Sequence, residues 1–180
     1  TRAIKKGTGE LAGETYEELS FEGYGVGGVA VVVETLTDNK NRTVADVRHL
    51  FDKYGAGLGA SGCVSWQFDK KGVIIMESEG LDEDAVMMQA LDAGAEDFLV
   101  EEGVFEIYTA PDDFSTVREA LEKEGYTFAQ AELQMVPQNY ITLEKEEDMA
   151  QMRKLLDNLE DNDDVQAVWH NWENEDDYEG

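Results

Sequence analysis

The chain has 180 residues and a mass of 20.1 kDa, which suits one medium-sized domain or two small ones. Its 14 lysine and arginine residues face 41 aspartate and glutamate residues, so the formal net charge is −27 and most of the surface repels DNA, RNA and anionic lipid. No apolar run approaches the ~20 residues of a membrane-spanning helix, and a single cysteine, Cys63, excludes an internal disulfide. We therefore expect a soluble protein of a reducing compartment.

The first part of the chain predicts a small sheet with one helix. Residues 1–15 are polar and predict a linker. The predicted helix begins at Asn41 or Thr43, either of which can cap it, and ends at Gly55. The glycine-rich segment Gly23–Gly28 separates the first two strands. The predicted strands are 17–22, 29–36 and 63–68.

From Val73 onward the predicted order becomes β-α-β-β-α-β, the ferredoxin-like order. Its strands are 73–78, 98–101, 104–109 and 131–136, and its helices are 82–93 and 112–124. After Pro137 come a strand at 140–143, a helix at 146–159 and a strand at 165–170. The central six elements are self-contained, whereas the flanking segments form a complete layer only when they are joined.

The sequence therefore predicts an α+β fold with two domains, one inserted into the other. A ferredoxin-like β-α-β-β-α-β domain of residues 72–138 interrupts a discontinuous α+β domain, residues 16–71 plus 139–172. Residues 173–180 are predicted to be a disordered acidic tail.

The charge is concentrated in the second part of the chain. Residues 1–71 hold nine bases and ten acids, whereas residues 72–180 hold five bases and 31 acids. A solvated, self-repelling surface that maintains solubility explains the acidic part. The near-neutral first part is where contacts with an anionic partner are expected.

The stretch Glu22–Phe51, EGYGVGGVAVVVETLTDNKNRTVADVRHLF, closely resembles the YebC/PmpR family of probable transcriptional regulators, as do Arg2–Glu10 and Leu58–Phe68. That family includes a mitochondrial translational activator, and members have been linked to ribosome function. The resemblance implies a helical bundle, an α/β domain and a ferredoxin-like domain inserted into the latter. It also implies that this chain corresponds to the second and third domains, with the basic helical domain absent.

The predicted helix carries the basic cluster of this acidic chain. Arg42, Asp46, His49 and Lys53 form a stripe opposite its apolar face, and Lys40 lies just upstream. Arginine can grip a phosphate with two bonds, and lysine supplies a point charge. The alternative is an ordinary solvated helix face with weak i,i+4 pairs. The candidate nucleic-acid-binding residues are Lys40, Arg42, His49, Lys53, Lys5, Lys6, Asn39 and Asn41.

Other features favour structural roles. Gly23–Gly28 could form an anion nest, but it opens a strand rather than a helix, so we interpret it as a tight connection between strands. Cys63 is expected to be a buried structural thiol. Trp66 and Trp169 lie in predicted strands and are expected in the core, whereas Trp172 is expected at the surface, where it could stack on a base.

Catalytic and metal-binding motifs are not found in the sequence. Neither His49 nor His170 neighbours a serine or cysteine in a recognised motif. The acidic segment 156–169 lacks the glycine and terminal glutamate of a calcium loop. We expect no enzymatic activity, cofactor or metal, and we disfavour an enzyme with an acidic metal site.

The predicted function is therefore a non-enzymatic regulator of gene expression that contacts nucleic acid. The resemblance favours a transcriptional regulator that binds DNA. The acidic second part favours the alternative, a ribosome-associated translation factor that contacts ribosomal RNA or tRNA, because a ribosome also offers protein surfaces. We expect a cytoplasmic bacterial monomer, or a protein of the mitochondrial matrix if the source is eukaryotic, whose strong binding requires the basic first domain.

Overall fold

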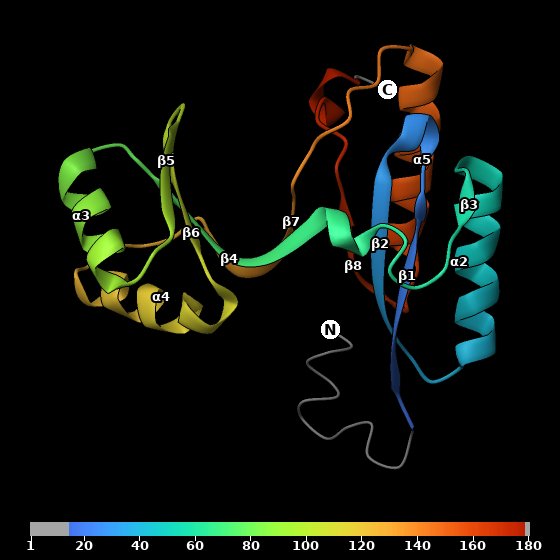
Figure 1. Cartoon of the computed structure of the whole chain (residues 1–180), viewed down its shortest axis with the longest axis horizontal. Coiled ribbons are helices and arrows are strands. Elements are labelled where there is room, and N and C mark those ends of the chain that lie inside the picture. The colour runs from blue at the N-terminus through green and yellow to red at the C-terminus, as the bar shows by residue number, and fades with distance from the viewer. Residues whose placement is uncertain (1–14, 179–180) are drawn as a thin grey trace. The chain divides into compact units, whose positions relative to one another are not determined.

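The computed structural model describes residues 15–178, and the chain divides into two compact units. Of the described residues, 15–67 and 139–178 form the first unit, and Phe68–Gln138 form the second (Figure 1). Each unit contains an antiparallel four-stranded sheet, so the predicted α+β class with a ferredoxin-like insertion is confirmed. Lys5 and Lys6, together with residues 1–14 of the predicted linker, lie outside the described residues.

The first unit builds one sheet and two helices from the two ends of the chain. Its sheet has the strand order β3-β1-β2-β8. The bounds of its elements are β1 Glu17–Tyr24, η1 Val26–Gly28, β2 Ala30–Thr37, α2 Lys40–Tyr54, β3 Gly57–Leu58, η2 Ser65–Gln67, α5 Glu146–Asp161, β8 Val165–His170 and η4 Glu175–Asp177.

The core of the first unit lies between the sheet and its two helices. β2 is central, and seven of its eight residues are buried, as the continuous apolar run predicts. Val31 and Val33 pack against apolar residues of α2 and α5, which contact each other. These helical core residues are Val47, Phe51, Met152, Leu155, Leu156 and Leu159.

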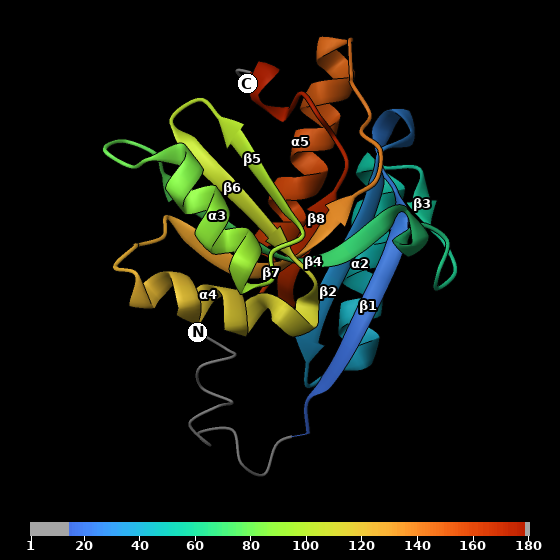
Figure 2. The ribbon, with the colours of Figure 1, turned by 60° about the vertical axis from the view of Figure 1, so that its left-hand side comes forward.

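The second unit has the ferredoxin-like topology. The strand order is β5-β6-β4-β7, and α3 and α4 cover one face of the sheet (Figure 2). Ile74 and Ile107 are directly paired and fully buried beneath these helices. The bounds are β4 Phe68–Glu77, α3 Glu83–Ala93, β5 Asp97–Glu101, β6 Val104–Thr109, η3 Pro111–Asp113, α4 Phe114–Lys123 and β7 Gln130–Pro137.

The strand predicted over 63–68 is wrong. The segment is a turn followed by η2, and the next strand, β4, begins only at Phe68. The reason is that the carboxylate of Glu22 accepts the backbone N–H groups of Gly62, Val64 and Ser65, which then cannot enter a sheet ladder. Cys63 accordingly lies in the turn and is half-buried rather than buried in a strand.

The placements predicted for two tryptophans are also wrong. Trp66 is 65% exposed, whereas Trp172 is only 3% exposed and belongs to the core of the first unit. The indole N–H of Trp172 donates to Asn174, whose own side chain bonds the backbone of Leu143. These bonds hold the start of the segment predicted as an acidic tail against the core. The strand predicted over 140–143 is reduced to a single bridge between Ile141 and Trp172.

Candidate nucleic-acid interface

Helix α2 carries most of the predicted contact residues, and its first turn is set by Asn39. The Asn39 side chain accepts a hydrogen bond from the Arg42 backbone N–H (3.1 Å), so the cap is Asn39 and not Asn41 or Thr43 as predicted. Thr43 instead buries its hydroxyl, which donates to the carboxylate of Asp164 (2.8 Å). Asn39 therefore stabilises the helix, and Asn41 remains exposed in the first turn.

Arg42 does not present an unpaired positive charge to solvent. Its guanidinium contacts both carboxylate oxygens of Asp164, at 3.0 Å from Nη2, and one of Asp38, also at 3.0 Å. The hydrogen bonds that the guanidinium donates to Asp164, and then those to Asp38, raise the pKa of Arg42. Two carboxylates therefore share this one guanidinium. Arg42 thus ties the start of α2 to the loop that precedes β8.

The stripe that contains Arg42 faces α5 and its acidic end. Asp46 and His49 line a shallow depression together with Asn158 and Asp161 of α5. A second depression beside it joins Arg42 and Asp46 to residues 162–164. A phosphate in either depression would meet carboxylates from both sides, so the C-terminal end of α5 weakens this part of the predicted interface.

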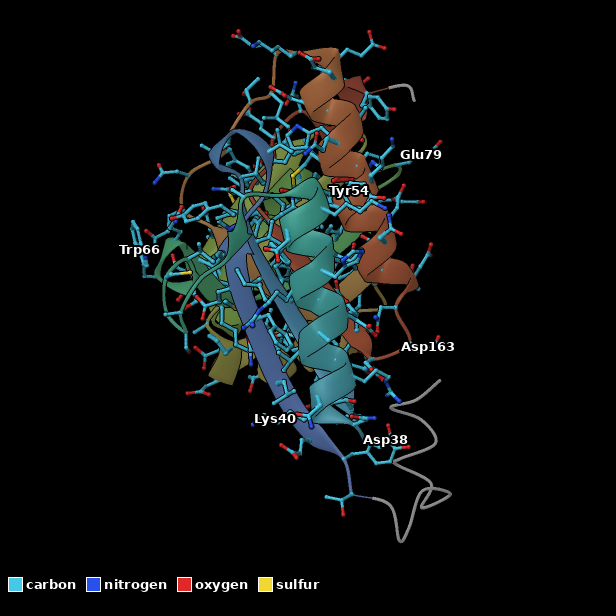
Figure 3. All side chains as sticks on the ribbon, turned by 90° about the vertical axis from the view of Figure 1, so that its right-hand side faces the viewer. Asp38, Lys40, Tyr54, Trp66, Glu79 and Asp163 are labelled. Carbon is cyan, nitrogen blue, oxygen red and sulfur yellow. The ribbon has the colours of Figure 1, made fainter. Side chains whose placement is uncertain are left out.

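Lys40 and Lys53 lie at opposite ends of the helix and are both exposed. Lys40 projects from the first turn (Figure 3), and the ammonium group of Lys53 lies 5.2 Å from the centre of the Tyr54 ring. Thirteen residues separate them, roughly 20 Å at 1.5 Å per residue, so they would contact different phosphates. The structure therefore places His49 and Arg42 in two neighbouring acidic depressions and leaves Lys40 and Lys53 outside both.

The glycine-rich segment Gly23–Gly28 is the hairpin connection between β1 and β2. It contains the short turn η1, in which Gly27 adopts a left-handed φ of 66° that favours glycine. A side chain on Gly25 would meet the sulfur of Met152 at 2.5 Å, so the fully buried Met152 side chain of α5 would have to shift to admit it. The segment has the role of a tight strand-to-strand connection, the interpretation that the sequence favoured.

A second feature of the first unit was missed by the sequence-based reasoning. Glu22, only 7% exposed, holds the loop 59–67 through backbone N–H groups at 2.6, 2.7 and 3.1 Å. Burial by itself would raise the pKa of Glu22, but these donors outweigh burial and hold that pKa below its ordinary value. The local signal was the run 55–68, which contains no charged residue in a chain that is 31% charged.

Two further findings limit the kinds of site present. Among residues 15–178, no three acidic, histidine or cysteine side chains are grouped so that they could hold a metal ion. No helix within the same range has the length and apolar character needed to span a bilayer.

Comparison with known proteins confirms the predicted resemblance. The family model for the TACO1/YebC second and third domain matches residues 16–172. A probable transcriptional regulatory protein of Acetivibrio thermocellus is 60% identical over 95% of this chain and 71% of its own length. One from Caldicellulosiruptor saccharolyticus is 57% identical, covering 96% of this chain and 71% of its own.

The fold is also found in a solved structure. The crystal structure of a conserved hypothetical protein, Aq1575 from Aquifex aeolicus, matches with a TM-score of 0.79 and 46% identity over 96% of this chain and 71% of that one. Fold, family model and relatives agree over nearly the whole chain. The chain therefore belongs to the TACO1/YebC family and matches the second and third domains of that family.

Proposed function

We propose that the chain acts as a non-enzymatic regulator of gene expression that contacts nucleic acid. The observation that carries the proposal is family membership, because relatives that are 57–60% identical are named probable transcriptional regulatory proteins. These relatives are bacterial, and the machinery of gene expression in bacteria lies in the cytoplasm, where we propose that a monomer of this protein works.

The exposed lysines at the two ends of helix α2 are the side chains that support a contact with phosphates. Lys40 and Lys53 are exposed, and within residues 15–178 neither has an acidic side chain in ion-pair distance. His49 and Asn41 are exposed on the same helix and can add polar contacts. Arg42, although partly exposed, has a structural role, because its ion pair with Asp164 holds the helix start in place.

The names of the relatives favour a transcriptional regulator that binds DNA as the first candidate, whereas the charge distribution favours RNA within a larger assembly. The second unit, residues 68–138, contains 18 acids and four bases. This unit would repel the phosphates of any long duplex DNA that came near it. A ribosome offers basic protein surfaces next to its RNA. A ribosome-associated translation factor is therefore the second candidate, favoured by this charge distribution.

The test is a charge reversal at both ends of α2. The double variant Lys40→Glu, Lys53→Glu should bind nucleic acid more weakly, and the slope of log K against log salt should fall by roughly 0.7–0.9 for each phosphate that the protein no longer neutralises. Lys123→Glu is the matched control, because Lys123 also lies in the last turn of a helix but in the acidic second unit. Affinity would be measured by anisotropy on duplex DNA and single-stranded RNA, and by co-sedimentation with ribosomes. Unchanged affinity and slope on every target would refute the proposed role of the two lysines.

A further inference from the structure

The loop 59–67 and the hairpin connection beside it form a neutral surface on a strongly acidic protein. Residues 55–68 and the connection 23–28 contain no charged side chain. β3 joins these segments, because Gly57 and Leu58 pair with Tyr24 and Gly23 of β1. The charge between them is that of Glu22, which is buried under the loop. An anionic partner therefore meets less repulsion here than over the acidic second unit.

The loop is held rigidly. Besides the three bonds to the Glu22 carboxylate, the backbone N–H of Gly59 donates to the Glu22 carbonyl at 2.8 Å. Within the loop, Cys63 and Gln67 donate backbone N–H bonds to Ala60 and Val64. A loop that is ordered in advance loses little conformational entropy when it binds a partner.

This rigid loop carries the large apolar side chain that is most exposed among residues 15–178. Trp66 is 65% exposed and projects outward from the molecule, well away from Lys40 at the start of α2 (Figure 3). Its indole N–H donates to the carbonyl of Cys63 at 3.0 Å, which sets the orientation of the ring. Gln67 donates to the hydroxyl of Tyr24 at 3.1 Å, so a second aromatic ring, 36% exposed, belongs to the same surface.

The chemistry of this surface fits a flat polar ligand. Ser65 and Gln67 flank Trp66 along the chain, so polar groups next to it can exchange hydrogen bonds while the ring supplies a π face. Bases in a duplex are stacked on one another, whereas an unpaired base can stack on an aromatic side chain. We infer that Trp66, whose neighbour Gln67 bonds the hydroxyl of Tyr24, is a stacking platform for an unpaired nucleobase of single-stranded RNA. The inference rests on the proposed nucleic-acid contact and adds a site remote from Lys40.

Stacking and phosphate contact leave different signatures. Base–aromatic stacking is typically worth about 1–3 kcal/mol per base, so Trp66→Ala should weaken binding by about 5- to 150-fold. No counterion is released by stacking, so the slope of log K against log salt should stay unchanged. Trp66→Phe should keep most of the affinity because it retains an aromatic face but, like Trp66→Ala, loses the bond to Cys63.

The experiment titrates the 180-residue chain into labelled oligoadenylate and into duplex RNA of equal length, at low ionic strength. Tyr140→Ala is the matched control, since Tyr140 is a 54% exposed aromatic residue of the same unit, and it should bind like the parent. Trp66→Ala should lose affinity for oligoadenylate only. Equal affinity of Trp66→Ala and the parent, or an equal loss on duplex RNA, would overturn the platform.

The same titrations separate the platform from the proposed function. One outcome is that the Lys40→Glu, Lys53→Glu variant binds more weakly and with a smaller slope of log K against log salt while Trp66→Ala binds like the parent. That result supports the phosphate contact and refutes the platform. If the parent chain binds neither RNA nor DNA, both are refuted. A loss on oligoadenylate for Trp66→Ala but not Trp66→Phe supports the platform, whatever the lysine variant does.

Discussion

Replacing Glu22 should loosen the loop that carries Trp66 and destabilise the first unit. One carboxylate oxygen accepts the N–H of Gly62 at 2.7 Å, and the other accepts those of Val64 and Ser65 at 3.1 and 2.6 Å. Glu22→Ala removes all three acceptors at once. The backbone N–H of a buried residue such as Val64 cannot easily turn to water, whereas Gly62 is exposed.

The expected loss of stability follows from these bonds. A hydrogen bond to a charged group contributes about 1.5–3 kcal/mol, and a buried donor left unsatisfied costs about 1–3 kcal/mol. Water can replace part of the lost bonding at the more exposed donors. We therefore expect Glu22→Ala to lower the free energy of unfolding by about 2–4 kcal/mol. Glu22→Gln retains one acceptor oxygen but turns an NH₂ group toward an N–H donor, so it should lose less than alanine. Glu18→Ala, an exposed carboxylate on the same strand, should stay within about 0.5 kcal/mol of the parent.

Urea unfolding monitored by tryptophan fluorescence is the assay, because Trp66, Trp169 and Trp172 all belong to the first unit. The pKa of Glu22 is lowered in the fold, so its stabilisation is present above the unfolded pKa of about 4.3 and is lost as the pH falls through the folded pKa. The difference between the parent and Glu22→Ala should therefore shrink in acid. Equal urea midpoints for Glu22→Ala and Glu18→Ala at neutral pH would refute the reasoning.

Three further outcomes are expected from the structure. Residues 68–138 alone should unfold cooperatively in urea, since this unit has its own core, and a broad, non-cooperative transition would contradict independent folding. Arg42→Ala should lower the urea midpoint of the first unit more than Lys53→Ala, because it removes the guanidinium that donates to the buried carboxylate of Asp164; equal midpoints would show that the ion pair contributes nothing. Burial lowers the pKa of His170, whose Nδ1 accepts the Trp172 N–H at 3.1 Å, so protonation favours the unfolded chain. Stability should therefore fall as the pH drops below the unfolded histidine pKa of about 6.5, and His170→Asn should flatten this dependence; identical pH profiles would refute it.

Much of the fold follows from local patterns in the sequence. The bounds of β6 and β8 agree with the predicted strands 104–109 and 165–170. The β-α-β-β-α-β order identifies the second unit, because alternation, helical periodicity and capping residues all act within a few positions of the chain. The glycine-rich run and LTDNxNRT identify the family in the same local way.

The roles of individual site residues depend on partners that are distant in the sequence. From the sequence, Arg42 is predicted to be one member of a basic stripe. In the folded chain its guanidinium pairs with Asp164, which is 122 residues away. The alternation over 63–68 predicts a strand and a buried Trp66. In the folded chain, the carboxylate of Glu22, about 40 residues upstream, accepts the backbone N–H groups of the loop and prevents that strand. Most elements, their order and the family follow from the sequence, because they depend on short-range patterns. The pairing of Arg42 and the exposure of Trp66 depend on the buried carboxylates of Asp164 and Glu22, which reach their partners only when the chain folds.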